Sequence, residues 1–97
     1  MPTREVLASF WRDWDRLSAE DQRAFRAAVE KFVEDLRVGR GLRKGLRVKG
    51  VEGARGIYEL TWAPDGRATF EFGRAVRDDE PHIIWRRIGG HQIFGNP

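Results

Sequence analysis

The chain has 97 residues, no cysteine and a formal net charge of +3, and 40% of its residues are hydrophobic, including four Trp and six Phe. This length and composition predict one folded domain over residues 1–97 and exclude a disordered chain. The lack of cysteine excludes disulfides and thiolate metal sites. We expect a soluble, cytoplasmic protein, because the chain has no long apolar run and no signal-peptide pattern.

The positive charge is concentrated in one part of the chain. Residues 1–36 carry a net charge of −2, and residues 37–97 carry +5. Most of this excess lies in residues 37–55, where seven basic side chains accompany one acidic residue, Glu52. Such a segment suits a polyanion such as nucleic acid, but a solvated loop that keeps the protein soluble fits it equally well.

Helical spacing dominates the first forty residues. Apolar residues from Phe10 onward predict a short helix over about residues 9–17. Ser18 is a favourable N-cap for a second helix, which we expect to end at Gly39 and Gly41. One apolar stripe of this second helix is predicted to enter the core: Phe25, Ala28, Val29, Phe32, Val33 and Leu36.

Six glycines lie among the basic side chains of residues 39–56. Glycine beside lysine can bind phosphate through backbone N–H groups. However, the spacing does not match a nucleotide-binding P-loop, and no strand–loop–helix order surrounds it. We therefore interpret this segment as a mobile basic arm.

A β-hairpin is predicted for residues 56–72, GIYELTWAPDGRATFEF, because apolar and polar residues alternate on both sides of a turn at residues 64–66. With a three-residue loop, one face pairs apolar residues: Trp62 with Ala68, Leu60 with Phe70 and Tyr58 with Phe72. The other face is polar: Glu59 lies opposite Glu71, Thr61 opposite Thr69, and Arg67 lies at the turn. Like charges that face each other across two strands destabilise a sheet unless cations lie nearby. We therefore predict that this polar face is a functional surface.

A polar connection over residues 74–81 follows the hairpin and contains the acidic residues 78–80. Three consecutive carboxylates cannot all point at one ion, so we expect a solvated loop rather than a metal site. We expect no metal and no cofactor in this chain. His82 comes directly after this connection, and we expect it at the surface.

A third strand is predicted for residues 82–88, HIIWRRI. Alternation leads us to expect Ile84 and Ile88 on the side facing the helices. Trp85 and Arg87 would then lie on the polar face, although burial of Trp85 also fits its size. Either assignment places one arginine on the core side, where it must extend to solvent or pair.

Two helices followed by three or four strands predict an α+β fold. We expect an N-terminal helical hairpin packed on one face of a small, three- to four-stranded antiparallel sheet. Residues 3–7 fit either a short edge strand or the lead-in to the first helix. Residues 91–94 form a short final segment after two glycines break the third strand.

Four stretches together cover nearly the whole chain and carry a family resemblance: FWRDWDRLSAEDQRAFRAAVEKFVEDL, GLRVKG, GIYELTWAPDGRATFEF and IIWRRIGGHQIF. The best single marker is the last stretch, in which a hydrophobic strand runs through Arg86 and Arg87 into His91 and then Phe94. In these stretches the chain resembles the RelE/ParE superfamily of toxins from type II toxin–antitoxin systems, particularly the RelE/HigB-like ribonucleases. The fold implied is RelE-like.

The resemblance implies a small toxin that cuts mRNA, usually in the ribosomal A site, and is silenced by a cognate antitoxin. We therefore expect an antitoxin protein and mRNA, on the ribosome, as partners, and no membrane. Relatives of this kind place basic residues after the hairpin turn and at the end of the next strand. Arg67 matches the first position, Arg87 and His91 match the second, and Phe94 is the aromatic residue that follows.

Metal-free RNA cleavage needs a base for the 2′-OH, cations for the attacked phosphate and an acid for the departing 5′-oxygen. His91 is the natural acid or base, since imidazole titrates near neutral pH. Arg67 and Arg87 would hold the scissile phosphate. Glu71, like Glu59, is a candidate base, but both carboxylates also fit as partners of these arginines. Further RNA contacts are predicted for Arg47, Lys49, Arg43, Lys44, Arg86 and Phe94.

Two other functions fit the same residues. One is a ParE-like toxin that inhibits DNA gyrase without nuclease chemistry. The other is a non-catalytic nucleic-acid-binding module in which the basic arm makes all the contacts. Replacing His91 or Arg67 should abolish cleavage only if the chain is a nuclease.

Overall fold

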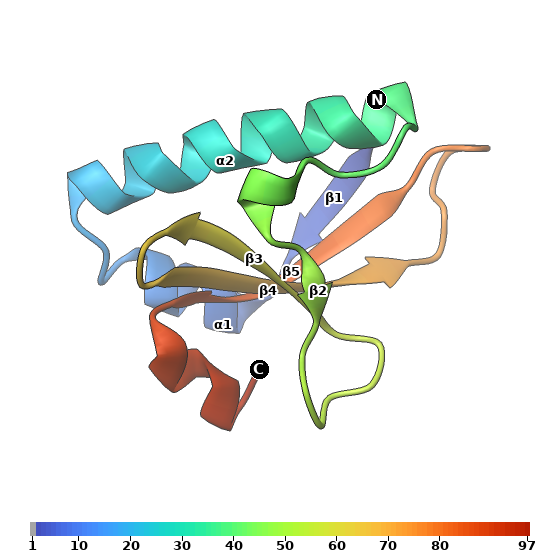
Figure 1. The fold of residues 1–97 in the computed structure, drawn as a ribbon. Helices are drawn as coiled ribbons and strands as arrows, with labels where there is room; N and C mark the ends of the chain where they lie inside the picture. Colours follow the sequence, from blue (N-terminus) through green and yellow to red (C-terminus); the bar gives the residue numbers. More distant parts are fainter. Residues whose placement is uncertain (1) are drawn as a thin grey trace.

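The structure, a computed structural model, describes residues 2–97 and contains two α-helices, two 3₁₀ helices and five strands within them (Figure 1). In chain order these are β1 (Thr3–Val6), α1 (Ala8–Trp14), α2 (Ala19–Val38), the 3₁₀ helix η1 (Lys44–Leu46), β2 (Lys49–Gly50), β3 (Tyr58–Ala63), β4 (Gly66–Gly73), β5 (His82–Gly89) and the 3₁₀ helix η2 (His91–Gly95). The strands form one sheet in the order β1-β5-β4-β3-β2. β1 and β5 are parallel and the other pairs are antiparallel, so the sheet is mixed.

The predicted α+β class is confirmed, but three features of the predicted architecture are wrong. The sheet has five strands rather than three or four, it is mixed rather than antiparallel, and β1 precedes the helices. β1 pairs residue by residue with β5, from Thr3 beside His82 to Val6 beside Trp85. β5 lies about eighty positions further along the chain than β1. The pattern of the four β1 residues alone could therefore not predict this pairing.

His82 secures β1 and is buried, which corrects its expected place at the surface. Its side chain is 7% exposed, its Nδ1 lies 2.7 Å from Thr3 Oγ1, and its Nε2 lies 3.0 Å from Glu5 Oε1. Both ring nitrogens are therefore satisfied by β1. The histidine acts here as a link between two parallel strands.

α2 follows its sequence signals closely. The Ser18 hydroxyl accepts a hydrogen bond of 3.0 Å from the N–H of Asp21, and Gly39 ends the helix with a left-handed φ of 77°. Phe25, Ala28 and Phe32 are buried. No helix within residues 2–97 is both long and apolar enough to cross a membrane.

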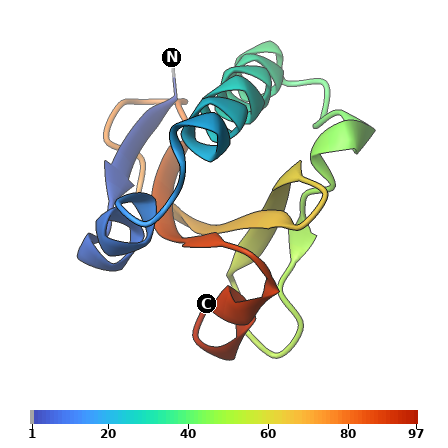
Figure 2. The ribbon, with the colours of Figure 1, turned by 90° about the vertical axis from the view of Figure 1, so that its left-hand side faces the viewer.

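The helices and the sheet share one core on the face that α2 covers (Figures 1 and 2). Trp85 lies at its centre, with ring centroids 5.3 Å from Phe25, 5.4 Å from Phe70, 5.8 Å from Phe32 and 6.2 Å from Phe10. α1 lies beside β5, beyond the end of β1, and contributes Phe10 to this core. η2 lies on the opposite side of the sheet, which we call the reverse face (Figure 2).

The expected facing of β5 is wrong at Trp85 and Ile84. Thr69 pairs with Arg87 and Phe70 pairs with Trp85, so Arg86 has no partner in β4 and forms a bulge. This extra residue lets Trp85 and Ile88 both enter the core, although they are three positions apart. Ile84 faces the other way, beside Glu71.

The hairpin is confirmed, but its register is shifted by two residues. Tyr58 pairs with Phe70 and Leu60 with Ala68, because the loop contains only Pro64 and Asp65 between Ala63 and Gly66 and a bulge between Thr61 and Ala63 shifts the pairing by one more residue. A Cβ on Gly66 would lie 2.6 Å from the Trp62 ring, so the turn depends on glycine there. A shift of two preserves the faces but alters the partners. Glu59 lies opposite Thr69 rather than Glu71.

Candidate active site

Arg67 lies at the tip of the β3–β4 hairpin, which we define as residues 63–67. Its Nη1 donates hydrogen bonds to the carbonyl oxygens of Ala63 (3.3 Å), Pro64 (3.3 Å) and Gly66 (3.0 Å). The guanidinium group therefore closes the turn with one nitrogen. Within residues 2–97, Nε and Nη2 have no hydrogen-bond acceptor, so they can bind an external anion.

His91, the first residue of η2, lies against the same hairpin tip. Its Nδ1 is 2.7 Å from Oδ1 of Asp65, and the two side chains are 64% and 81% exposed. The bond orients the imidazole and leaves Nε2 open to solvent. The Phe94 ring meets the imidazole edge-on, with centroids 5.7 Å apart and an interplanar angle of 78°.

Glu59 projects from β3 into a hollow of about 300 Å³ on the reverse face. The residue is only 8% exposed, yet its carboxylate has no hydrogen bond or ion pair with any residue of the range 2–97. Lys49 lies beside it on the neighbouring strand, and Arg47 and Arg67 line the same hollow. Glu59 is thus a carboxylate with little exposure, with no partner among residues 2–97 and with three basic side chains around its hollow.

The backbone explains why Arg47 and Lys49 reach this hollow. Leu46, at the end of η1, is 3% exposed and anchors the segment in the core. Arg47 then adopts a left-handed φ of 49°, which turns the chain into β2 beside β3. These two predicted RNA-binding residues therefore lie next to the hairpin tip.

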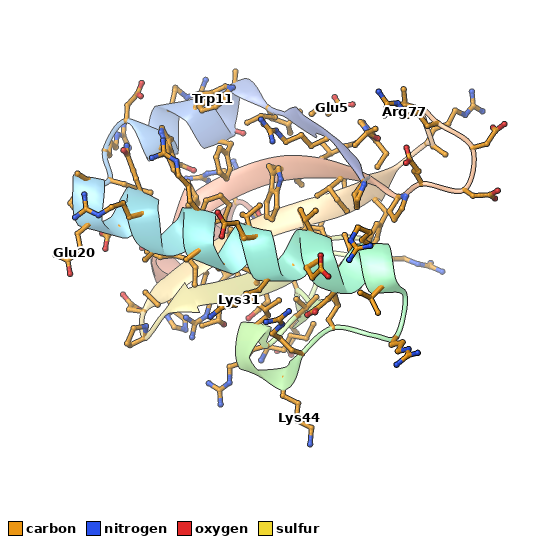
Figure 3. The ribbon with its side chains drawn as sticks, turned by 90° about the horizontal axis from the view of Figure 1, so that it is seen from above. Glu5, Trp11, Glu20, Lys31, Lys44 and Arg77 are labelled. Carbon is orange, nitrogen blue, oxygen red and sulfur yellow. The ribbon has the colours of Figure 1, made fainter. Side chains whose placement is uncertain are left out.

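The other two predicted contacts of the basic arm lie elsewhere. Arg43 binds Asp35 of α2 through Nε (2.9 Å) and Nη2 (2.7 Å). This pairing and the N–H of Arg43 lower the pKa of Asp35 to about 2. The side chain of Lys44 extends from η1 away from the body of the protein (Figure 3). The arm is thus divided between a contact with α2 and the reverse face.

Glu71 is not part of the group at the hairpin tip. Its carboxylate forms an ion pair with Nη1 of Arg86, and its partner on β5 is Ile84, further along β4. Nε of Arg86 also donates to the carbonyl oxygen of Pro97 at 3.1 Å. Glu71 and Arg86 therefore hold η2 and the following residues to the sheet.

Arg87 braces α1 against β5. Its Nε and Nη2 lie 2.6 and 3.2 Å from the carboxylate of Asp13, and its Nη1 donates to the carbonyl oxygen of Asn96 at 2.9 Å. Hydrogen bonding to Asp13 raises the pKa of Arg87. Asp13 also accepts the N–H of Ile88 at 3.1 Å, where β1 no longer covers the edge of β5.

A hollow of about 440 Å³ places Arg87 near the hairpin tip. Asp65 and Gly66 line it from the tip, and Arg87 lines it from β5. Arg67 does not line this hollow, because it lies on the Glu59 side of the turn. The structure thus brings His91, Arg67 and Phe94 to the tip and places Arg87 beside it in a separate hollow.

Asp65 is the site residue that the sequence did not indicate. Its type and its neighbours are those of a turn residue, so the sequence predicts only the turn there. Its partner His91 lies 26 positions away, so no local pattern joins them. For Glu59 the sequence predicts a candidate base equivalent to Glu71; the burial and the lack of a partner that distinguish Glu59 are visible only in three dimensions.

Comparison with known proteins gives matches among solved structures only. No family model and no curated protein matches the chain. A copper-bound mutant toxin from Helicobacter pylori is 20% identical, with 95% of this chain and 97% of that chain covered and a TM-score of 0.62. The RelB–RelE antitoxin–toxin complex from Methanococcus jannaschii gives 16% identity, 94% of both chains and a TM-score of 0.60. A YoeB/ParE toxin from Agrobacterium tumefaciens gives 13% identity, 92% of this chain and 98% of that chain, and a TM-score of 0.65.

The chain has the RelE/ParE toxin fold. At these identities the likeness concerns the fold, and it confirms the resemblance predicted from the sequence at that level. Within the RelE/ParE fold the parts of the present site lie on β2, β3, the hairpin tip and η2.

Proposed function

We propose that this chain is the toxin of a type II toxin–antitoxin system and acts as a metal-independent endoribonuclease on mRNA associated with the ribosome. One observation carries the proposal. An exposed imidazole and a guanidinium group with free N–H donors lie at one hairpin tip, and the guanidinium group shares a hollow with a carboxylate without a partner, on the face that α2 leaves uncovered. These groups are the base, acid and phosphate ligand that cleavage next to a 2′-OH requires.

Glu59 is the proposed general base and takes the place predicted for Glu71. It removes the proton of the 2′-OH, and the 2′-oxygen forms a bond to the adjacent phosphorus. The bond from phosphorus to the 5′-oxygen breaks, and protonated His91 gives its proton to that oxygen. The products are a 2′,3′-cyclic phosphate and a 5′-hydroxyl, so atoms and charges balance without a metal.

The remaining residues position the substrate or the acid. Nε and Nη2 of Arg67 bind the scissile phosphate as negative charge develops on it. Asp65 is a positioning residue, because it holds Nδ1 of His91 so that Nε2 faces the substrate. Arg47 and Lys49 bind flanking phosphates. Phe94, beside His91, provides an aromatic ring on which an unpaired base can stack.

The proposed partner is a cognate antitoxin. Two structures with this fold are toxin–antitoxin complexes, one of them the E. coli DinJ–YafQ complex, which is 14% identical with a TM-score of 0.63. The basic surface of the reverse face suits an acidic segment of such a partner.

The test is cleavage of RNA in EDTA by the purified protein, with free RNA and with translating ribosomes as substrates. We expect new 5′-hydroxyl and 2′,3′-cyclic phosphate ends from the wild-type protein. Glu59→Gln, Arg67→Ala and His91→Ala should each lose them. Arg74→Ala is the matched control, because Arg74 is exposed in the β4–β5 connection. Cleavage that survives in His91→Ala, or inhibition of DNA supercoiling without RNA cleavage, would overturn the proposal.

A further inference from the structure

A second polar hollow, of about 220 Å³, lies on the far side of Arg87 from the hairpin tip. It is formed by α1, β5 and the end of the described chain. Its lining residues are Ser9, Arg12, Asp13, Arg16, Arg86, Arg87, Asn96 and Pro97. The proposed cleavage mechanism uses neither Arg12 of α1 nor Arg16 of the turn after it.

Arg12 and Arg16 are the cations in this hollow that the fold does not use. Both are exposed, and neither guanidinium group forms a hydrogen bond or ion pair with any residue between positions 2 and 97. Arg86 and Arg87, in contrast, are occupied by carboxylates and by carbonyl oxygens. Among the side chains that line the hollow, only that of Asp13 carries a carboxylate, and both of its oxygens already accept hydrogen bonds.

This arrangement carries an excess of positive charge. Arg12 lies on α1 and Arg16 in the turn directly after it, and both guanidinium groups line one hollow, where like charges repel. Two further guanidinium groups line the same hollow. An anion between Arg12 and Arg16 would relieve this repulsion, and phosphate suits paired guanidinium groups because each can donate two parallel hydrogen bonds.

The second hollow continues from the site. It shares Asp13, Arg16 and Arg87 with the 440 Å³ hollow, whose opposite wall is formed by Asp65 and Gly66 of the hairpin tip. A chain of phosphates that leaves the tip along this wall therefore reaches Arg16 first and Arg12 next. Because successive phosphates of one strand can contact both arginines, we favour an RNA strand over a single small anion as the ligand.

We propose that Arg12 and Arg16 form a phosphate-binding subsite that holds RNA nucleotides beyond the cleaved bond. The inference rests on the proposed ribonuclease function and extends it to Arg12 of α1 and Arg16 of the turn after it, a segment that the sequence indicated only as a core helix. The subsite adds affinity for RNA long enough to reach α1. It leaves the chemical step at the hairpin tip unchanged.

The test compares Arg12→Gln/Arg16→Gln with the matched control Arg23→Gln/Arg74→Gln, whose residues are exposed on α2 and in the β4–β5 connection. Binding of a 2′-O-methyl RNA of about twelve nucleotides is followed by fluorescence anisotropy over a range of salt concentrations. For single strands, log K changes with log salt by about 0.7 per phosphate contact, so two lost contacts reduce the slope by about 1.4. We expect that reduction, with about tenfold weaker binding at low salt, in the α1 variant alone.

Arg12→Lys/Arg16→Lys keeps the charges and should keep most of the salt slope. With a cleavable four-nucleotide RNA the α1 variant should keep the wild-type kcat, whereas KM for the longer RNA rises about tenfold. An unchanged slope and affinity in the α1 variant would overturn the subsite. So would a loss of polyglutamate binding with RNA binding intact, which would assign α1 to an acidic protein segment. A wild-type protein that binds RNA with the α1-dependent slope but never cleaves it refutes the nuclease proposal and keeps the subsite.

Discussion

Two aspartates on this chain contact a basic side chain at nearly identical distances, with opposite consequences. Asp13 meets Arg87 at 2.6 Å, with side chains that are 10% and 23% exposed. Asp65 meets His91 at 2.7 Å, with side chains that are 81% and 64% exposed. The first pair is inside the fold and holds a helix to a strand. The second is at the surface, where it contributes little to stability and leaves the imidazole available for chemistry.

The difference arises from what surrounds each carboxylate. Asp13 lies where β1 has ended and the edge of β5 would otherwise be open, and it accepts the N–H of Ile88 as well as Arg87. Asp65 is in a two-residue turn with solvent on most sides. The same bond is therefore structural in one place and functional in the other, and each can be broken separately.

The largest expected effect comes from Asp13→Ala. This change leaves a half-buried guanidinium group without its partner and removes the acceptor of a backbone N–H. Breaking such a pair typically costs about 3–5 kcal/mol in the free energy of unfolding. Urea denaturation measures it, with Asp15→Ala as the control at an exposed aspartate, expected to change stability by less than about 0.5 kcal/mol. A loss of under about 1 kcal/mol for Asp13→Ala would mean that the Arg87 pair is not structural.

Replacing His91 should affect activity and spare stability. Removal of a general acid typically lowers the rate by about 10²–10⁴-fold, so His91→Ala should lose at least about 100-fold in RNA cleavage. Its urea midpoint should stay near that of the wild-type protein, because the imidazole is exposed. Single-turnover cleavage and urea denaturation on the same preparation separate the two effects. If His91→Ala were destabilised but cleaved RNA normally, the Asp65–His91 pair would be structural rather than functional.

A smaller effect is expected from Asp65→Asn. The amide oxygen can still accept a hydrogen bond from His91, but the negative charge is lost. We expect about a fivefold lower kcat with KM unchanged, since exposed charge pairs contribute up to about 1 kcal/mol, which is a factor of about five in rate. Steady-state kinetics on a short RNA measures it. Asp65→Ala, which also removes the acceptor, should fall between Asp65→Asn and His91→Ala.

The smallest effect concerns a third aspartate pair, Asp35 with Arg43. Its partner lowers the pKa of Asp35 from 3.8 to about 2. A lowered pKa means that the pair stabilises the fold above pH 4, and that this contribution is lost as the pH falls toward 2. The wild-type protein should therefore have a slightly higher urea midpoint than Arg43→Gln at pH 7, and the two should converge near pH 2. A constant difference across this range would exclude Asp35 as the cause.

Local patterns were sufficient to predict part of the fold. The apolar stripe and Ser18 cap predict α2, and the alternation around Pro64 predicts the hairpin with the correct faces. Two other features depend on contacts between distant segments. β1 becomes a strand only because β5 is beside it, and the Arg86 bulge is defined by the register with β4. For the same reason the predicted antiparallel sheet is mixed.

The candidate site divides in the same way. His91, Arg67 and Phe94 were indicated by residue type and by their place relative to predicted strands, and the structure brings them to one turn. The choice between Glu59 and Glu71 could not be made from the sequence, since both alternate onto the reverse face. The choice depends on which carboxylate forms an ion pair with an arginine. Arg86 pairs with Glu71 because the bulge directs its side chain to the reverse face.

Arg86 also marks the one place in β5 where a residue can be removed without moving the other side chains to the opposite face of the sheet. Deleting Arg86 would leave Trp85 beside Phe70 and Arg87 beside Thr69, the pairs that already exist. Deleting Ile84 instead would move an arginine among the aromatic rings. Arg86, as the extra residue of the bulge, thus adds a positive charge to the reverse face. The residues of β5 that pack in the core keep their pairing with β4.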